Sequence, residues 1–104
     1  DAEELIGVQE KPPILWIRGD SDMIVSDNSM FDLGALGSLG YVPGWPGMDV
    51  YPPQPMLKQT RAVLDAYAME GGEYTEHVIA DAAHGVFIEK PKEFNALFHA
   101  FLSQ

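Results

Sequence analysis

The sequence contains no cysteine, and this absence excludes disulfide bonds and any chemistry that requires a thiolate. Basic residues are also scarce: 6 Lys and Arg stand against 16 Asp and Glu, which gives a formal net charge of −10. A surface with this charge repels phosphate backbones and anionic lipid, so neither nucleic acid nor a membrane surface is an expected partner. No apolar run approaches the roughly 20 residues that a membrane-spanning helix needs, so we expect no membrane span.

Length and hydrophobic content are those of an ordinary folded chain. The 104 residues are enough for one small domain, and a hydrophobic share of 46% argues against disorder. A free domain of this size buries only about two-thirds of the surface of its unfolded chain. Its expected margin of stability is therefore thin.

The predicted elements follow the order strand, long loop, helix, strand, helix, which is typical of an α/β fold. The first strand is predicted at residues 14–17, an apolar run that follows a polar connector at residues 1–12. Apolar residues at helical spacing predict a helix over residues 55–70, and strand formers predict a second strand over residues 74–80. Pro91 opens a final helix with an apolar stripe. A strand–helix–strand unit predicts two parallel strands joined by a right-handed crossover.

The first strand shows no alternation of apolar and polar residues, which suits a strand buried on both faces of a parallel sheet. Two strands are too few for an independent sheet, and two helices cannot easily cover both faces of the first strand. We therefore expect further strands on polypeptide outside this sequence.

Residues 27–55 are predicted to form a long loop insertion, because glycine and proline at this density break helices and strands. Loops of this length often line or cover a site, and a surface excursion without a role is the alternative. Four large side chains of this loop could line an acyl or aromatic pocket or could pack the loop against the body of the protein. The loop members are Tyr41, Trp45, Met48 and Tyr51. Together with Tyr41 and Trp45, Phe87 completes our candidate substrate-binding residues.

Two polar clusters follow the two predicted strands, and each contains a residue suited to acid–base chemistry. Asp22 lies shortly after the first strand, and His84 lies shortly after the second. Because parallel strands end at the same edge of a sheet, we expect these two side chains to lie close together. A carboxylate beside an imidazole accepts the Nδ1 proton, fixes the tautomer and stabilises the imidazolium that forms when Nε2 takes a proton.

These segments resemble the α/β-hydrolase family. The matching motifs are residues 13–25, PILWIRGDSDMIV, and residues 81–94, DAAHGVFIEKPKEF. The resemblance implies a three-layer α/β-hydrolase fold, of which residues 1–104 are the C-terminal part of a single domain with its last two parallel strands and flanking helices. It also implies that Asp22 is the acid and His84 the base of a catalytic triad.

Further positions bear on this resemblance. Gly19, Glu89 and Pro91 match the family's signatures around the acid and the base. Ala83 departs from them, because the family usually has glycine before the histidine, and alanine makes the backbone of that turn less free.

The nucleophile is missing from this sequence. The elbow Gly-x-Ser-x-Gly does not occur, and residues 37–40, GSLG, have the wrong spacing and no strand before them. In the family's order of nucleophile, acid and base, this chain supplies the last two. The expected partner is therefore a companion polypeptide segment that carries the nucleophile, with serine the expected residue, and the oxyanion hole.

The function implied by the resemblance is hydrolysis of an ester or related acyl bond in a small-molecule substrate, without cofactor or metal. An aspartate nucleophile would instead give an epoxide hydrolase or a haloalkane dehalogenase. A carbon–carbon bond hydrolase and a cofactor-free haloperoxidase-like enzyme are also compatible. A further alternative is a non-catalytic ligand-binding protein on a hydrolase scaffold.

Other acids and histidines have competing interpretations. Asp20 is the alternative acid, although its position in the motif favours Asp22. His77 falls within the second predicted strand and His99 within the last helix, which favours structural roles for both.

Four aspartates close together in the sequence suggest a calcium loop: Asp20, Asp22, Asp27 and Asp32. An EF-hand loop needs an acid or amide at its fifth position and then glycine. Counted from Asp20 the fifth position is Ile24, and no glycine follows. We therefore expect no metal site here.

Overall fold

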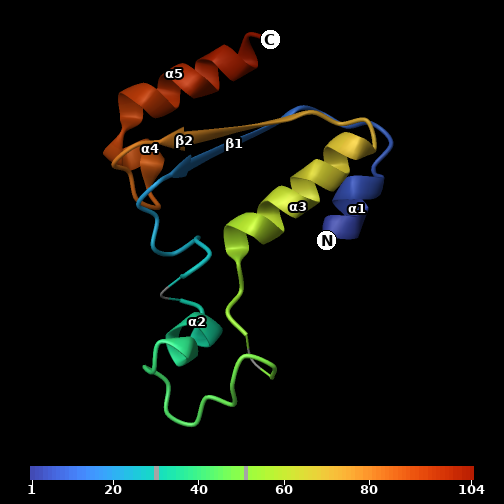
Figure 1. The fold of residues 1–104 in the computed structure, drawn as a ribbon. Coiled ribbons are helices and arrows are strands. Elements are labelled where there is room, and N and C mark those ends of the chain that lie inside the picture. The colour runs from blue at the N-terminus through green and yellow to red at the C-terminus, as the bar shows by residue number, and fades with distance from the viewer. Residues whose placement is uncertain (30, 51) are drawn as a thin grey trace. The chain divides into compact units, whose positions relative to one another are not determined.

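The computed structural model describes residues 1–29, 31–50 and 52–104, which divide into two compact units (Figure 1). Unit 1 comprises Asp1–Asp22 and Ala62–Gln104, and unit 2 comprises Met23–Arg61. Helix α3 (Met56–Met69) begins in unit 2 and ends in unit 1. The glycine- and proline-rich residues 27–55 fall wholly within unit 2.

A two-stranded parallel sheet forms the centre of unit 1. Strands β1 (Ile14–Gly19) and β2 (Tyr74–Ile79) pair along their whole length, from Ile14 opposite Tyr74 to Gly19 opposite Ile79. The sequence prediction of both strands and of their parallel direction is confirmed. Their aromatic and β-branched residues favour this extended, pleated backbone.

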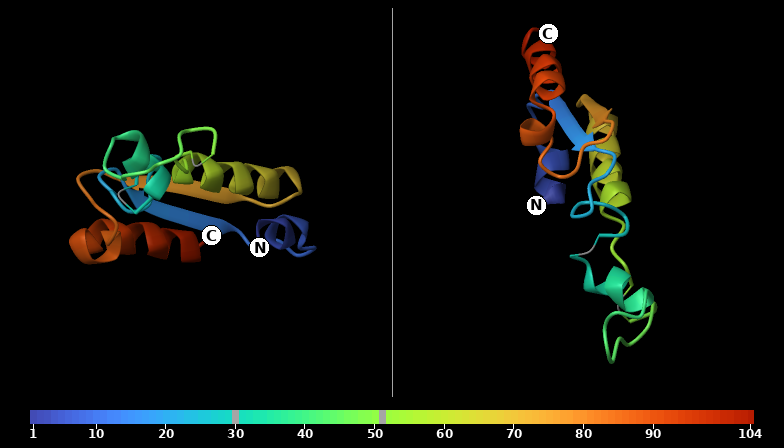
Figure 2. Two further views of the ribbon diagram at one scale, coloured as in Figure 1. Left: turned by 90° about the horizontal axis from the view of Figure 1, so that it is seen from below. Right: turned by 90° about the vertical axis from the view of Figure 1, so that its left-hand side faces the viewer.

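Helices lie on both sides of this sheet. Figure 2 shows α5 (Pro91–Leu102) on one side and the unit 1 part of α3 on the other. Both helices were expected. Pro91 suits the start of α5 because proline has no N–H, and an N–H at the first helical position would have no acceptor within the helix. Tyr67 of α3 is fully buried, and its hydroxyl donates a hydrogen bond to the carbonyl of Pro12. This bond ties α3 to the segment that leads into β1.

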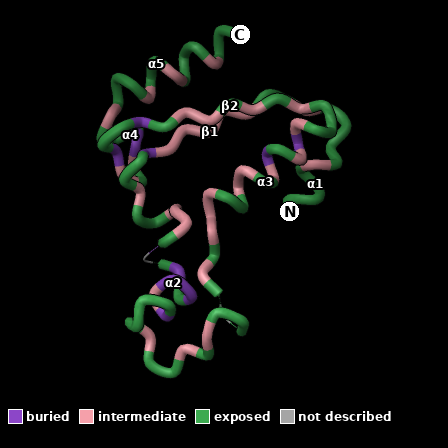
Figure 3. The backbone as a smooth tube through the Cα atoms, viewed as in Figure 1, coloured by how far each residue is buried: buried purple, intermediate pink, exposed green. Residues whose placement is uncertain are grey.

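The core of unit 1 lies at the carboxyl ends of the strands. Its buried members are Ile79, Ala82 and Val86, and Ile17, Phe94 and Leu97 pack against them. The short helix α4 (Val86–Glu89) contributes Val86 to this cluster. Figure 3 shows the same concentration of buried residues near α4.

The expected burial of β1 on both faces is not achieved within this chain. Residues 14–18 are only half-buried, and burial is complete only at Gly19. The helices of this chain therefore cover β1 incompletely, although its composition is that of a strand inside a larger sheet.

The N-terminal segment differs from the predicted connector, because it forms helix α1 (Ala2–Gly7). A capping box explains the difference: the Asp1 carboxylate accepts a 2.9 Å hydrogen bond from the Glu4 N–H, and the Glu4 carboxylate accepts one of 3.1 Å from the Asp1 amino group. The reciprocal bonds satisfy backbone donors at the start of the helix.

Unit 2 contains a helix that the sequence did not predict, α2 (Leu33–Ser38). Asp32 caps it by accepting a 2.9 Å bond from the Gly34 N–H. Gly37 serves close packing, since a Cβ there would lie 2.3 Å from the ring of Trp45. Gly37 therefore allows Trp45 to pack against α2, whereas the sequence analysis expected glycine here to prevent regular structure.

Two aspartates of unit 2 accept hydrogen bonds from residues that follow them by 22 positions or more. Asp27 accepts hydrogen bonds from the N–H groups of Leu57 and Lys58, at 2.8 and 3.2 Å, in the first turn of α3. Asp32 accepts from the Gln54 N–H as well as capping α2. Both carboxylates therefore join the two ends of the glycine- and proline-rich segment.

Candidate active site

The carboxyl ends of β1 and β2 bring two loops together in unit 1. The Asp20 N–H donates to the Ile79 carbonyl at 3.1 Å, which extends the ladder one residue beyond β1. The Ser21 N–H donates to the Ala82 carbonyl at 2.9 Å. The loop after β1 is therefore bonded directly to the loop after β2.

Gly19 makes this close approach possible. A Cβ at Gly19 would lie 2.0 Å from the Ala82 carbonyl oxygen, a distance that no real side chain tolerates. Ala82 itself is fully buried. Glycine is required here because backbone, and no movable side chain, occupies the space.

The structure places Asp22 and His84 in direct contact at this edge. Asp22 Oδ2 lies 3.0 Å from His84 Nδ1, although the two residues are 62 positions apart. The Asp22 side chain is 8% exposed, whereas that of His84 is 54% exposed. The carboxylate is thus largely sheltered from solvent, whereas the imidazole remains open to it.

This geometry fixes the roles of the two imidazole nitrogens. An ionised carboxylate can only accept hydrogen bonds, so Nδ1 carries the proton in this pair. Nε2 then keeps a lone pair that can take a proton from a hydroxyl group or a water molecule. The pair can therefore act as a base whose imidazolium form is stabilised by Asp22.

Asp20, the alternative acid, has a different partner. Its Oδ1 accepts a 2.9 Å hydrogen bond from the backbone N–H of Asp81 and a 3.1 Å bond from the Ser21 hydroxyl. Glu89 of α4 similarly accepts the Ala83 N–H at 3.0 Å. Sequence reasoning assigned no such bonds to Asp20 or Glu89, and nothing in the motif could have identified the backbone donors.

The other two histidines lie away from this pair within unit 1. His77 is in β2 and lines a small hollow with Leu15 and Leu97. His99 is in α5, and its ring lies edge-on to Phe98 at 6.3 Å between centroids.

The candidate substrate-binding residues fall in both units. Phe87 of α4 is 58% exposed and contacts Phe94 edge-on, with 6.1 Å between ring centroids. In unit 2, Tyr41 is 74% exposed, and Trp45 packs over Gly37 and lines a hollow of about 170 Å³. The role of all three in binding a substrate stays a prediction.

The remaining two loop candidates are Met48 and Tyr51. Met48 is exposed in unit 2. Tyr51 lies outside the described residues.

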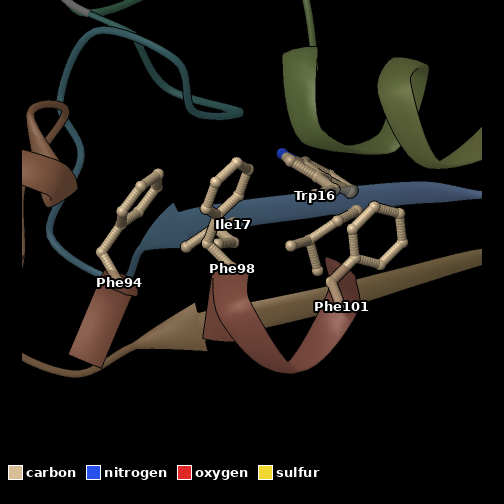
Figure 4. Close-up of a pocket in the computed structure, with 6 residues that line it drawn as sticks. Trp16, Ile17, Phe94, Phe98 and Phe101 are labelled. Carbon is tan, nitrogen blue, oxygen red and sulfur yellow. The ribbon is translucent and has the colours of Figure 1, made fainter. Parts of the chain in front are cut away.

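An apolar groove that the sequence did not predict lies along the side of β1 that faces away from β2 (Figure 4). Its volume is about 400 Å³. The lining residues are Leu15, Trp16, Ile17, Phe94, Phe98 and Phe101. The apolar stripe of the last helix indicated a buried face, but only a part of that stripe is covered: Phe98 is still exposed.

Two further properties concern metals and membranes. Across residues 1–29, 31–50 and 52–104, no three His, Asp or Glu side chains gather as metal ligands would. None of the helices in the described part of the chain has the length and apolar character needed to cross a membrane.

Comparison of the chain with protein-family models, with curated proteins and with solved structures found no match in any of the three.

Proposed function

We propose that this chain supplies the acid and the base of an enzyme with a three-layer α/β-hydrolase fold that hydrolyses ester or related acyl bonds. The observation that carries the proposal is the 3.0 Å contact between Asp22 Oδ2 and His84 Nδ1 at the carboxyl ends of two parallel strands. In open α/β sheets this edge is where functional groups gather.

In the proposed mechanism, His84 is the general base and Asp22 orients it. Nε2 takes the proton of a nucleophilic hydroxyl group as its oxygen attacks the substrate carbonyl carbon. The imidazolium then gives this proton to the leaving alkoxide, which departs as an alcohol. A water molecule, deprotonated by Nε2 in the same way, then attacks the acyl-enzyme. The imidazolium returns this proton to the nucleophile's oxygen as the acid is released.

We infer that the nucleophile comes from a companion polypeptide segment, because residues 1–104 contain no Gly-x-Ser-x-Gly elbow. The exposed edge of β1 supports this inference. The N–H groups of Ile14 and Asp20 donate to carbonyl groups on the β2 side. In a parallel pair, alternate residues of a strand bond to the neighbouring strand, so the N–H groups of Leu15 and Ile17 face away from β2.

The described residues provide no third strand to pair with Leu15 and Ile17. The apolar groove lies along the same edge. A further strand of the companion segment would pair with these groups and would complete the burial of β1.

The proposal is tested by substituting His84 in the complete protein. His84→Ala should leave the circular dichroism spectrum unchanged and remove almost all hydrolysis of an activated ester such as a p-nitrophenyl ester. His99→Ala is the matched control, because His99 is an exposed residue of α5 that does not contact Asp22. This variant should retain activity. Full activity in His84→Ala would contradict the assigned base.

Labelling locates the nucleophile. A fluorophosphonate probe reacts with activated serine, so mass spectrometry of the labelled complete protein should find the modified serine outside residues 1–104. Labelling of Ser38, in the GSLG segment, would contradict the companion segment. Failure to label, together with turnover of an epoxide or a haloalkane, would replace serine by an aspartate nucleophile.

A further inference from the structure

The backbone that leads into His84 is held at three consecutive residues. The Asp81 N–H donates to Asp20 Oδ1 at 2.9 Å, and the Ala83 N–H donates to Glu89 Oε2 at 3.0 Å. Between them, the Ala82 carbonyl accepts from the Ser21 N–H at 2.9 Å. Two carboxylates, one from the loop after β1 and one from α4, therefore accept hydrogen bonds from the same short loop.

This loop needs external support. Asp81 has a φ of 58°, in the left-handed region that residues with a side chain rarely adopt. Aspartate adopts this region more readily than most residues, but the conformation still costs free energy that contacts around the loop must offset. The bond from the Asp81 N–H to Asp20 falls on this strained residue.

The imidazole cannot supply the support itself. His84 is 54% exposed, and a single hydrogen bond from its neutral ring to Asp22 contributes only modestly to holding the side chain in place. The distance between Nδ1 and Asp22 is therefore set mainly by the backbone that carries His84. The bonds to Asp20 and Glu89 act on the backbone itself, which has fewer rotatable bonds between it and the ring position than a distant support would, so they restrict where the imidazole can lie.

We propose that Asp20 and Glu89 are positioning residues: they hold the loop that carries His84 so that its ring stays within hydrogen-bond distance of Asp22. Asp20 ties this loop to the loop that carries Asp22. Glu89 reaches back from α4 to the residue directly before His84. The consequence for turnover rests on the proposed hydrolase function, whereas the positioning of the ring does not.

The kinetic test uses pairs of variants in the complete protein. Glu89→Ala and Asp20→Ala remove the acceptor, whereas Glu89→Gln and Asp20→Asn keep a side-chain oxygen that can accept the same N–H. The alanine variants should lower kcat roughly 10- to 100-fold with KM nearly unchanged, because small misplacements of a catalytic group have effects of this size. The amide variants should restore most of the loss.

The matched control is Glu93→Ala, which removes a nearby exposed carboxylate of α5 and should leave kcat unchanged. Circular dichroism verifies that each variant is folded. If Glu89→Ala unfolds, Glu89→Met removes the acceptor while keeping the length of the side chain. Wild-type kcat in both acceptor-deleted variants, or equal damage from Glu89→Gln and Glu89→Ala, would overturn the proposal.

A spectroscopic measurement separates positioning from the hydrolase function. In ¹⁵N-labelled protein, the Nδ1–H of His84 bonded to Asp22 should give a protected imidazole proton signal, identified by its loss in His84→Ala. This signal should disappear in Glu89→Ala and persist in Glu89→Gln, even if the wild-type protein hydrolyses no ester. Persistence of the signal in both Glu89→Ala and Asp20→Ala would overturn the positioning role, whatever the activity.

Discussion

Units 1 and 2 use their aspartates in different ways. In unit 2, Asp27 and Asp32 accept backbone N–H groups and close a glycine- and proline-rich segment. In unit 1, Asp20 does the same for Asp81, whereas Asp22 meets the imidazole of His84. Neighbouring carboxylates in one acidic stretch thus differ in their partners: Asp20, Asp27 and Asp32 accept backbone N–H groups, whereas Asp22 contacts an imidazole.

The four aspartates considered for a calcium loop are Asp20, Asp22, Asp27 and Asp32. Three of them have oxygens bonded to backbone N–H groups, and these bonds serve the fold. We expect truncation of a carboxylate to lower activity most at Asp22, to lower it less at Asp20 through the position of His84, and to lower mainly stability at Asp27 and Asp32.

The largest expected effect is that of Asp22→Asn in the complete protein. Asparagine keeps the size of the side chain but can present an N–H to His84 Nδ1, which favours the wrong imidazole tautomer. Loss of such an orienting carboxylate lowers turnover about 10⁴-fold in a well-studied triad. We expect a decrease of that order in kcat for an activated ester, with a nearly unchanged unfolding transition in urea.

Asp65→Asn is the matched control for this charge change. Asp65 lies on the exposed side of α3, where its carboxylate accepts from the Tyr74 hydroxyl. Its substitution should leave kcat within about twofold, because the residue does not contact the imidazole. A similar fall in kcat for both variants would show that Asp22 acts through general charge and does not orient His84.

The second prediction concerns Gly19, where the two loops of unit 1 meet. Gly19→Ala would place a Cβ 2.0 Å from the Ala82 carbonyl oxygen, so the loops must separate. We expect the free energy of unfolding to fall by about 1–3 kcal/mol, the usual range for overpacking, and kcat to fall with it. Urea denaturation followed by circular dichroism measures the first effect.

Gly7→Ala is the control for Gly19→Ala, since a Cβ at Gly7 would meet nothing within 4 Å. Alanine also has the higher helix propensity, so this change in α1 should be neutral or slightly stabilising. Equal stability of Gly19→Ala and the wild type would mean that the two loops can move apart without cost.

The sequence predicted unit 1 better than unit 2. Continuous strand formers and apolar residues at helical spacing identified β1, β2, α3 and α5, because burial of these patterns requires regular structure. In unit 2 the glycine and proline content of residues 27–55 predicted a loop, so α2, which contains Gly34 and Gly37, was missed. The two glycines are needed because Pro52 and Trp45 approach the helix closely, and such long-range contacts leave no local pattern.

The candidate site shows the same division. The order of Asp22 and His84 after two strands was enough to expect them at one edge of the sheet. The bonds of Asp20 and Glu89 to backbone N–H groups could not be foreseen, because every residue except proline offers the same donor. The half-buried state of β1 agrees with the expectation that two helices cannot easily cover both faces of this strand.

The smallest expected effect is that of Asp27→Ala in unit 2. Its carboxylate accepts from Leu57 and Lys58 in the first turn of α3, as an N-cap residue would, although it lies about thirty positions earlier in the chain. Loss of a cap costs about 1 kcal/mol, so we expect a decrease of this size in the free energy of unfolding. Turnover should be nearly unchanged in the folded variant, in contrast to Asp22→Asn.

Two matched variants sharpen this last measurement. Asp27→Asn keeps an oxygen that can accept both N–H groups and should retain most of the stability, since asparagine caps helices about as well as aspartate. Asp49→Ala removes an exposed carboxylate elsewhere in unit 2 and should have no measurable effect on unfolding. If Asp27→Ala instead abolished turnover while unfolding at the wild-type urea concentration, Asp27 would act in chemistry like Asp22. The difference between the aspartates of the two units would then disappear.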